Sequence, residues 1–247
     1  MLIVANWKAY VEELPKAKKL FAASKRLARA TGITIVLAPP APFLGALAAN
    51  NKSKVSFSAQ DVSVTTGGAK TGEATAQIYA AAGATYAIIG HSERRALGET
   101  NAVIAEKLAH ALAHGLTPIL CVGEKERDGE GRYLAYVREE LTLALEPLTA
   151  KERSQIIVAY EPLWAIGKTA ADAIESNDLA EMTLYIRKVL AELLPGKSSR
   201  HSFVLYGGSV EPGNIRALAA DSGVEGFLIG HATVDPLMFS TLVKQLA

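Results

Sequence analysis

The sequence predicts an α/β protein built as a closed (β/α)8 barrel, and three observations carry this prediction. Short apolar runs rich in β-formers alternate with longer amphipathic runs, which is the pattern of repeated βα units on a parallel sheet. Eight such apolar runs occur, and several lack polar alternation, as expected for strands covered on both faces. The chain has 247 residues, a common length for such a barrel. No linker-like tract divides it, so we expect one domain over residues 1–247.

The predicted elements follow this alternation along the chain. We expect strands at residues 2–5, 34–38, 55–59, 86–89, 118–122, 156–160, 203–206 and 226–229. The clearest helices cover residues 14–30, 101–114, 132–148 and 177–193, because apolar residues recur there at intervals of three and four. In the last helix we expect an inward stripe of Leu184, Ile186, Leu190 and Leu193, with Glu181, Arg187, Lys188 and Glu192 mostly facing solvent.

Composition narrows the class of protein. Hydrophobic residues make up 49% and charged residues 21%, as in soluble globular proteins with a large core. The net charge is +1, so we expect no nucleic-acid or membrane partner. The first residues lack a basic segment and no apolar run is long enough for a membrane span, which favours a cytoplasmic location. Cys121 is the single cysteine; an intramolecular disulfide and a cysteine-rich metal site are thereby excluded, and we expect a buried strand residue.

The run over residues 157–170 is the most informative part of the chain. Apolar β-formers lead into Glu161, then Pro162 ends the strand, and a loop of small residues follows. A glutamate at the C-terminal end of a buried strand, followed by a loop with a stiff start and a glycine, is typical of a catalytic base beneath a moving lid. We therefore expect the chemistry at Glu161.

Other polar residues follow the predicted strands in the same way. In a (β/α)8 barrel the active site lies at the C-terminal ends of the strands, so these residues should meet at one mouth. They are Asn6 and Lys8 after the first strand, residues 91–95 after the fourth, Gly207, Gly208 and Ser209 after the seventh, and Gly230 and His231 after the eighth. A glycine pair with serine is a weak signal alone, but its place after the seventh strand, together with Gly230, favours a phosphate site.

Five segments carry a resemblance to a known family. They are Ala5-Asn6-Trp7-Lys8, Gly90-His91-Ser92-Glu93-Arg94-Arg95, Cys121-Val122-Gly123-Glu124, residues 159–167 and residues 205–210. In these motifs, which occur in the family's order, the chain resembles the triosephosphate isomerase family. The resemblance implies a TIM barrel, a homodimer, no cofactor or metal, and interconversion of dihydroxyacetone phosphate and glyceraldehyde 3-phosphate through an enediolate.

The resemblance also implies roles for the matching residues; in part these roles are a known worked example of acid-base tuning and lid closure. Glu161 would abstract a proton beside the carbonyl, and His91, as a neutral imidazole near a helix N-terminus, would polarise that carbonyl and shuttle protons between the two oxygens. Lys8 would supply positive charge, with Asn6 as a neutral donor. Glu93 would anchor Lys8, because a buried ammonium group needs a carboxylate partner.

For the phosphate group, donors without bulky side chains are expected. Backbone N–H groups of Gly167, Ser209, Gly230 and His231 would supply them. Ile166 and Leu228 would form an apolar clamp over the base.

Several neighbouring residues are expected to have structural roles only. Glu124 and Arg95 would belong to the scaffold around the base, and Arg187 with Glu225 would form an ion pair at the far end of the barrel. We expect the remaining histidines on helix or loop surfaces, in contact with solvent; they are His110, His114 and His201.

Three positions depart from the family's pattern. The lid usually reads Ala-Ile-Gly-Thr-Gly-Lys-Thr-Ala, whereas here Gly167 runs directly into Lys168, so two residues are missing and with them the glycine that bonds the serine of the Gly-Gly-Ser loop. The contact of Ala170 with Tyr206 should survive. His231 replaces a second glycine, so either its backbone is strained or its ring contacts the phosphate or the lid. Lys70 replaces a residue that is often apolar or aromatic, in the loop over residues 67–73, which in the family enters the neighbouring subunit.

Two other functions remain alternatives. Another phosphosugar barrel enzyme, such as a phosphoribosyl isomerase, would explain a phosphate site but not Lys8, His91 and Glu161 together. A non-catalytic barrel that only binds phosphorylated metabolites would fit the shortened lid, but not the intact acid-base residues.

Overall fold

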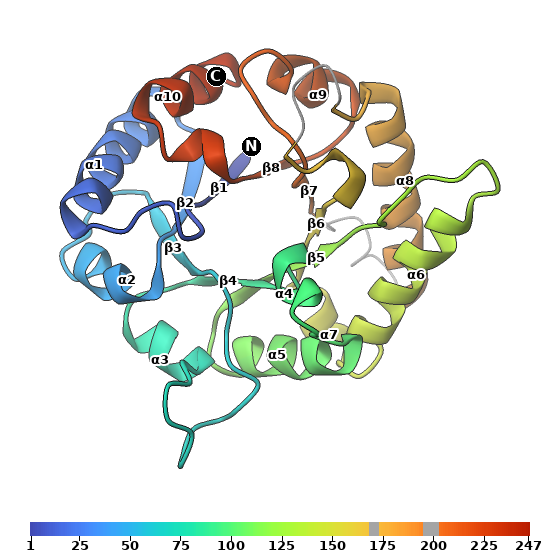
Figure 1. Cartoon of the computed structure of the whole chain (residues 1–247), viewed down its shortest axis with the longest axis horizontal. Coiled ribbons are helices and arrows are strands. Elements are labelled where there is room, and N and C mark those ends of the chain that lie inside the picture. Colours follow the sequence, from blue (N-terminus) through green and yellow to red (C-terminus); the bar gives the residue numbers. More distant parts are fainter. Residues whose placement is uncertain (168–172, 195–202) are drawn as a thin grey trace.

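A closed barrel of eight parallel strands forms the centre of the computed structural model, which describes residues 1–167, 173–194 and 203–247. Each strand pairs with the next in the chain, and β8 pairs with β1 to close the ring. The strands are β1 (Leu2–Asn6), β2 (Thr34–Ala38), β3 (Ser56–Ala59), β4 (Tyr86–Ile89), β5 (Thr117–Val122), β6 (Ile157–Tyr160), β7 (Val204–Tyr206) and β8 (Gly226–Ile229) (Figure 1). The predicted (β/α)8 TIM barrel is thereby confirmed.

Helices surround the barrel as an outer ring (Figure 1). In the described ranges these are α1 (Leu14–Thr31), α2 (Ala41–Ala48), α3 (Ala76–Ala81), α4 (Ser92–Ala96), α5 (Asn101–Ala113), α6 (Arg132–Leu145), α7 (Ala150–Arg153), α8 (Ser176–Leu193), α9 (Ile215–Asp221) and α10 (Pro236–Gln245). Two 3-10 turns, η1 (Leu163–Ala165) and η4 (His231–Thr233), follow β6 and β8. Two loops project from the ring, one between β3 and α3 and one between β5 and α6.

Alternation along the strands separates two apolar layers. One cluster consists of strand residues alone: Leu2, Val4, Val36, Ala38, Ile88, Ile119, Cys121, Ile157, Ala159, Leu205 and Leu228. The intervening strand residues, such as Ile3, Ile35 and Phe57, pack with helix residues in the second cluster. Successive side chains of a strand point to opposite faces, so the first cluster fills the barrel and the second joins it to the helices.

Some predicted boundaries and orientations in the helices were wrong. The helix predicted to reach residue 148 ends at Leu145. Glu146 still has helical backbone angles, but Pro147 has no N–H with which to continue the helical hydrogen bonds. The inward stripe of α8 does not include Leu184, which is 66% exposed. Residues two positions apart in a helix point in directions that differ by about 200°, so Leu184 cannot share a face with the buried Ile186. The buried apolar residues of that helix are Leu179, Met182, Ile186, Val189 and Leu190.

The expectations for the outlying charged residues were mostly right. Arg187 pairs with Glu225, which directly precedes β8 at the N-terminal end of the barrel. His114 is exposed as predicted, but His110 is only partly exposed, and its buried Nδ1 finds no hydrogen-bond partner among the described residues. His201 lies outside the described ranges. No helix within those ranges is long and apolar enough to cross a membrane.

Candidate active site

A cavity of about 480 Å³ opens at the C-terminal ends of the strands, where the site was predicted. The ends of five strands, β1, β4, β6, β7 and β8, and the segments after them contribute to its wall, so residues far apart in the sequence meet there. Every residue predicted to take part in catalysis or substrate binding lines this cavity: Asn6, Lys8, His91, Glu93, Glu161, Ile166, Gly167, Ser209, Leu228, Gly230 and His231.

Glu161 directly follows β6 and is 2% exposed. Its backbone N–H donates to Val122 O at 2.8 Å, which continues the parallel pairing of β6 with β5. Its carboxylate accepts a hydrogen bond from the backbone N–H of Ser92 at 3.1 Å, and Oε1 lies 3.3 Å from Nε2 of His91. The thiol of Cys121 also lies within hydrogen-bonding reach of this carboxylate. The carboxylate thus faces the cavity with the imidazole of His91 beside it, the geometry that a general base needs.

Small residues leave room for this carboxylate. A Cβ at Gly207, which follows β7, would lie 2.8 Å from Cγ of Glu161, so a side chain there would displace the base. Cys121 on β5 is fully buried as predicted, and burial raises the pKa of its thiol well above the usual value, with the Glu161 carboxylate adding to the effect. The thiol therefore stays neutral beside the base.

His91 caps the N-terminus of α4. Its Nδ1 accepts a hydrogen bond from the backbone N–H of Glu93 at 3.1 Å. In a neutral ring the single proton must then lie on Nε2, the atom that faces Glu161. The local fold therefore selects the tautomer that can donate a hydrogen bond into the cavity.

Lys8 meets Glu93 as predicted, with Nζ 2.8 Å from Oε1. The expected burial of this pair was wrong, since 21% of the Lys8 side chain and 60% of the Glu93 side chain are exposed. Both side chains are exposed because they lie at the open end of the cavity rather than at its base. Asn6 is buried, and its Oδ1 accepts from the backbone N–H of Lys8 at 3.0 Å, which leaves the NH₂ group of the amide as its donor.

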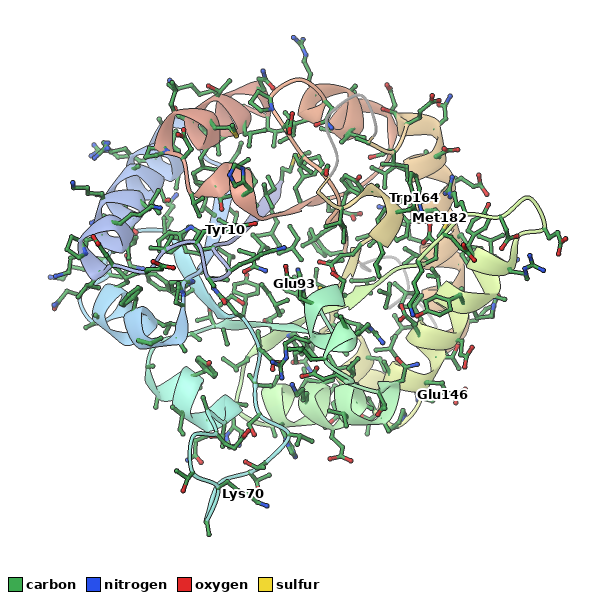
Figure 2. The ribbon with its side chains drawn as sticks, viewed as in Figure 1. Tyr10, Lys70, Glu93, Glu146, Trp164 and Met182 are labelled. Atoms are coloured by element: carbon green, nitrogen blue, oxygen red, sulfur yellow. The ribbon has the colours of Figure 1, made fainter. Side chains whose placement is uncertain are left out.

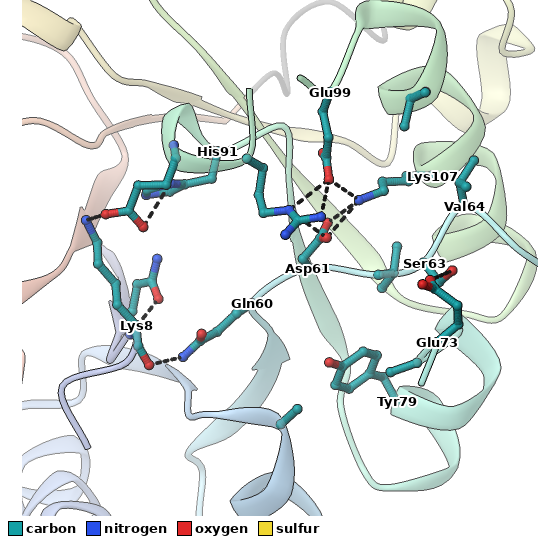
Figure 3. Close-up of a pocket in the computed structure, with 17 residues that line it drawn as sticks. Lys8, Gln60, Asp61, Ser63, Val64, Glu73, Tyr79, His91, Glu99 and Lys107 are labelled. Atoms are coloured by element: carbon teal, nitrogen blue, oxygen red, sulfur yellow. Dashed lines mark hydrogen bonds and ion pairs between the residues drawn. The ribbon is translucent and has the colours of Figure 1, made fainter. Parts of the chain in front are cut away.

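The backbone of Lys8 is strained. Among the residues that the structure describes, it is the one non-glycine residue with a positive φ, 45°. The side chain of Gln60, just after β3, donates to Lys8 O and to Ala38 O, both at 2.9 Å (Figure 3). Backbone strain of this kind persists only where surrounding contacts hold it, and Gln60 supplies such a contact.

Gln60 was missed in the sequence. It directly follows a predicted strand, and that position was the signal that could have found it. A lone glutamine after a strand matches no catalytic motif, so its residue type alone did not mark it.

The start of the loop after β6 is tied to the scaffold. Glu124 is 1% exposed, and its Oε1 accepts hydrogen bonds from Tyr160 Oη and Trp164 Nε1, both at 2.8 Å. Burial and the Glu124 carboxylate raise the pKa of Tyr160. Trp164 stands on the 3-10 turn that follows Glu161 (Figure 2). Neither Glu124 nor Arg95 lines the cavity, which agrees with the predicted scaffold role.

The opposite wall carries the residues predicted to bind phosphate. Ser209 donates its backbone N–H to Ala165 O at 3.3 Å, which joins the loop after β7 to the 3-10 turn after β6. His231 begins η4, and its ring packs edge-on against Tyr10, with centroids 5.6 Å apart. Its backbone does not have the positive φ that would strain it. Of the two outcomes considered for His231, backbone strain was wrong.

A metal site is not part of this arrangement. Within the described ranges, no group of three or more His, Cys, Asp or Glu residues is placed to hold a metal ion. Among the described residues that line the cavity, Lys8 is the one lysine or arginine.

Comparisons with known proteins bear on this geometry. The model of the family described as triosephosphate isomerase matches residues 1–246. A triosephosphate isomerase of Symbiobacterium thermophilum is 37% identical over 250 residues, covering 100% of this chain and 96% of the relative. That of Coprinopsis cinerea is 38% identical over 234 residues, covering 94% and 92%, and that of Thermus thermophilus is 37% identical over 247 residues, covering 99% and 98%. This chain belongs to the triosephosphate isomerase family.

The family membership confirms the resemblance seen in the motifs, and with it the isomerase class. Of the three departures expected from the family's pattern, two involve residues that line this cavity, Gly167 at the start of the short lid and His231. Ile166 and Gly167 are described and line the cavity, whereas residues 168–172 fall in the gap of the description, including Lys168, Thr169 and Ala170. The predicted Ala170 contact of Tyr206 therefore lies outside the described residues. Leu228 is buried on the cavity wall, as the apolar clamp with Ile166 requires.

Proposed function

We propose that this chain, as one barrel domain over residues 1–247, interconverts dihydroxyacetone phosphate and D-glyceraldehyde 3-phosphate through an enediolate. The observation that carries the proposal is the meeting of Glu161 and His91 beside Lys8 in one cavity of a triosephosphate isomerase family member. A carboxylate, a neutral imidazole and an ammonium group are what a proton transfer beside a carbonyl needs.

The proton steps balance with these groups. Glu161 removes a proton from C1 of dihydroxyacetone phosphate, and the electron pair moves onto the carbonyl oxygen at C2. His91, whose Nε2–H faces the cavity, donates its proton to O2 and takes one from O1. Glu161 then returns its proton to C2, which gives the aldehyde at C1. For this the substrate inserts at the His91–Glu161 contact, so the imidazole N–H turns from the carboxylate to the substrate oxygens.

Charge and water exclusion complete the proposal. Lys8 stabilises the negative oxygen of the enediolate, and Asn6 donates a neutral hydrogen bond. Backbone N–H groups of Gly167, Ser209, Gly230 and His231 bind the phosphate, with Ile166 and Leu228 as apolar cover over the base. All of these residues line the same cavity.

A coupled assay with glyceraldehyde 3-phosphate tests this function. We expect steady turnover by the parent, and loss of activity by on the order of 10²- to 10³-fold or more in Lys8→Ala, since the oxyanion and phosphate lose their cation. Lys16→Ala is the matched control, because that exposed lysine donates only to Tyr10 O at 3.2 Å. No turnover by a folded parent would favour the non-catalytic alternative; turnover of a phosphoribosyl substrate instead would favour another phosphosugar enzyme.

We also propose a homodimer in which the loop over residues 67–73 docks into its partner. This loop projects from the barrel with Lys70 at its tip, and its residues are exposed (Figure 2). Beside the active site lies a second cavity of about 540 Å³, whose wall includes Asn6, Lys8, His91 and Glu93 (Figure 3). A projecting loop and a cavity of this size on one surface support a docking between two copies.

Ion-paired side chains form one wall of that second cavity, and their exposed fractions run from 4% at Lys107 to 42% at Arg94 (Figure 3). Lys107 Nζ lies 2.7 Å from Asp61 Oδ2 and 2.6 Å from Glu99 Oε1, and Arg94 pairs with both acids. Burial raises the pKa of Asp61. Burial alone would also raise the pKa of Glu99, but hydrogen bonds from Lys107 and Arg94 outweigh it and lower that pKa. A network held this firmly supports a preformed docking surface.

A cytoplasmic location belongs to the same set of proposals. Cys121 is a free, buried thiol, which suits a reducing compartment. Fractionation of cells that express the tagged chain tests it, and recovery in a membrane or extracellular fraction would contradict it.

A further inference from the structure

Glu140 is a buried carboxylate that the proposed mechanism does not use. It lies on α6 among apolar residues and is 3% exposed. Burial raises its pKa. It does not line the cavity that holds Glu161. Because a buried carboxylate is unfavourable without partners, its contacts indicate what it is for.

These contacts join the ends of two neighbouring strands. Glu140 Oε1 lies 3.1 Å from Arg95 Nη1, and Oε2 accepts from the backbone N–H of Gly123 at 2.9 Å. Arg95 belongs to α4, after β4, and Gly123 directly follows β5. One carboxylate on the outer helix layer therefore holds both segments.

Arg95 extends the link to the barrel backbone. Its Nε donates to Gly90 O at 2.9 Å, and its Nη2 donates to Cys121 O at 3.2 Å. Gly90 directly precedes His91 in the chain. The Glu140 carboxylate, by pairing with the guanidinium, fixes the direction in which these donors point.

Both held segments touch the base. A Cβ at Gly123 would lie 2.0 Å from the backbone oxygen of Glu161, so these two backbones are in direct contact. On the other segment, Ser92 N–H donates to the Glu161 carboxylate at 3.1 Å, next to His91. The backbone of Glu161 thus contacts the end of β5, while its carboxylate accepts a hydrogen bond from the start of α4.

We propose that Glu140 is a positioning residue for the isomerase reaction, acting through Arg95 and Gly123 to set Glu161 against His91. It touches no substrate. The inference rests on the proposed isomerase function, and it assigns to α6 a part in that reaction. A displacement of about 1 Å between catalytic groups lowers rates by about 10²-fold, so a small shift of β4 against β5 suffices for a large effect.

The test compares Glu140→Gln with a matched variant at the other end of the barrel. Glu225 makes the same kinds of contact: its carboxylate accepts from the backbone N–H of Val204 at 2.7 Å and pairs with Arg187. Glu225→Gln therefore removes the same kinds of contact far from the site, although the Glu225 side chain is 32% exposed and that of Glu140 is 4% exposed. For parent and both variants, kcat, KM for glyceraldehyde 3-phosphate and Ki for inorganic phosphate are measured at a fixed interval below each variant's Tm.

We expect kcat to fall by about tenfold or more in Glu140→Gln, with KM and the phosphate Ki within about twofold of the parent. In Glu225→Gln we expect kcat within about twofold. Exposed Glu139 controls for the charge lost from α6, and Glu139→Gln should match the parent. If Glu140→Gln lost only stability, its kcat per folded molecule would stay within about twofold of the parent, as expected for Glu225→Gln.

Three results would overturn the proposal: kcat of folded Glu140→Gln within threefold of the parent, an equal loss in Glu225→Gln, or a loss carried by KM alone. If Glu140→Gln does not fold, Arg95→Lys and Glu140→Asp are measured in the same way, and the same split between kcat and KM is expected. An inactive parent would instead contradict the proposed function, so the two failures are distinguishable.

Discussion

The imidazole of His91 and the carboxylate of Glu161 face each other across 3.3 Å, from Nε2 to Oε1. The other ring nitrogen of His91 is held by the backbone N–H of Glu93, and the other carboxylate oxygen of Glu161 by the backbone N–H of Ser92. Each reactive group is thus fixed through its far atom by α4 and presents its near atom to the cavity. The backbone therefore fixes the direction of both groups, and the distance between them depends on the length of the Glu161 side chain.

Glu161→Asp is predicted to lower turnover by on the order of 10²-fold or more, because the carboxylate retracts by about one methylene from its partners. Folding should change little, since the charge and the buried site are kept. The coupled assay gives kcat, and thermal unfolding gives the stability. Activity within threefold of the parent would show that the base is elsewhere.

Gln60→Ala is predicted to lower kcat/KM by about tenfold or more. Lys8 O loses its donor, whereas Ala38 O keeps the N–H of Trp7 at 3.1 Å, so the effect falls on the strained backbone at Lys8. A left-handed non-glycine residue costs roughly 1–3 kcal/mol, and without Gln60 we expect it to relax. Gln155→Ala is the control, since Gln155 is exposed and donates only to Lys151 O. Equal kinetics for the two variants would contradict a role for Gln60.

The fold, the residues that line the site and the supports Glu93, Glu124 and Arg95 could be predicted, but the supports Gln60 and Glu140 could not. Strand runs and the polar residues after them follow from local pattern, which is why Lys8, His91 and Glu161 were found. The contacts of Gln60 and Glu140 are between residues far apart in the chain, and no local pattern marks a glutamine or glutamate that binds backbone atoms of another segment. The orientation error at Leu184 arose from counting apolar residues without tracking their angle around α8.

The stability of the protein is predicted to fall with rising pH through Cys121. Burial, then the nearby Glu161 carboxylate, hold the pKa of the folded thiol above its unfolded value of about 8.5. Its contribution is therefore complete below that pH and is lost as pH rises, at up to about 1.4 kcal/mol per pH unit. The free energy of unfolding, measured with urea, should fall between pH 8 and pH 10 in both proteins. The fall should be about 2 kcal/mol smaller in Cys121→Ala than in the parent. Tyr160 and Tyr206 also have raised pKa values, but both proteins contain them, so their effect cancels in the comparison. An equal fall in the two proteins would therefore show that the thiol does not contribute.

A dimer is predicted in sedimentation at micromolar concentration. Shortening the projecting loop by removing residues 67–72 should give a monomer with lower activity, since the loop would no longer close the cavity beside Lys8 and His91. Substituting Lys70 alone with Ala tests the tip and should leave the barrel folded. A parent that sediments only at 26.1 kDa would contradict the dimer.

The short lid is predicted to release the enediolate more often than a full-length one. Closure protects this intermediate from solvent and from loss of phosphate, so a lid without one of its bonds should allow methylglyoxal to accumulate. The measurement is the ratio of methylglyoxal to isomerised product at saturating substrate, for the parent and for a variant with Thr-Gly inserted between Gly167 and Lys168. A lower ratio in the insertion variant is expected. An equal or higher ratio, with parent turnover of ~10–10³ s⁻¹, would instead indicate a compact lid that closes by other contacts.

Closure of the ring divides the catalytic groups between two halves of the molecule. The ends of β1 and β4 carry Lys8 and His91, whereas the ends of β6, β7 and β8 carry Glu161, Ser209 and Gly230. Two seams, β4 with β5 and β8 with β1, join these halves. Neither half alone holds both proposed proton-transfer groups, Glu161 and His91, so we expect turnover only from molecules in which the ring is complete. Activity can be measured during refolding, or after separately produced halves are mixed. In both cases it therefore reports the final step of assembly rather than the average secondary-structure content.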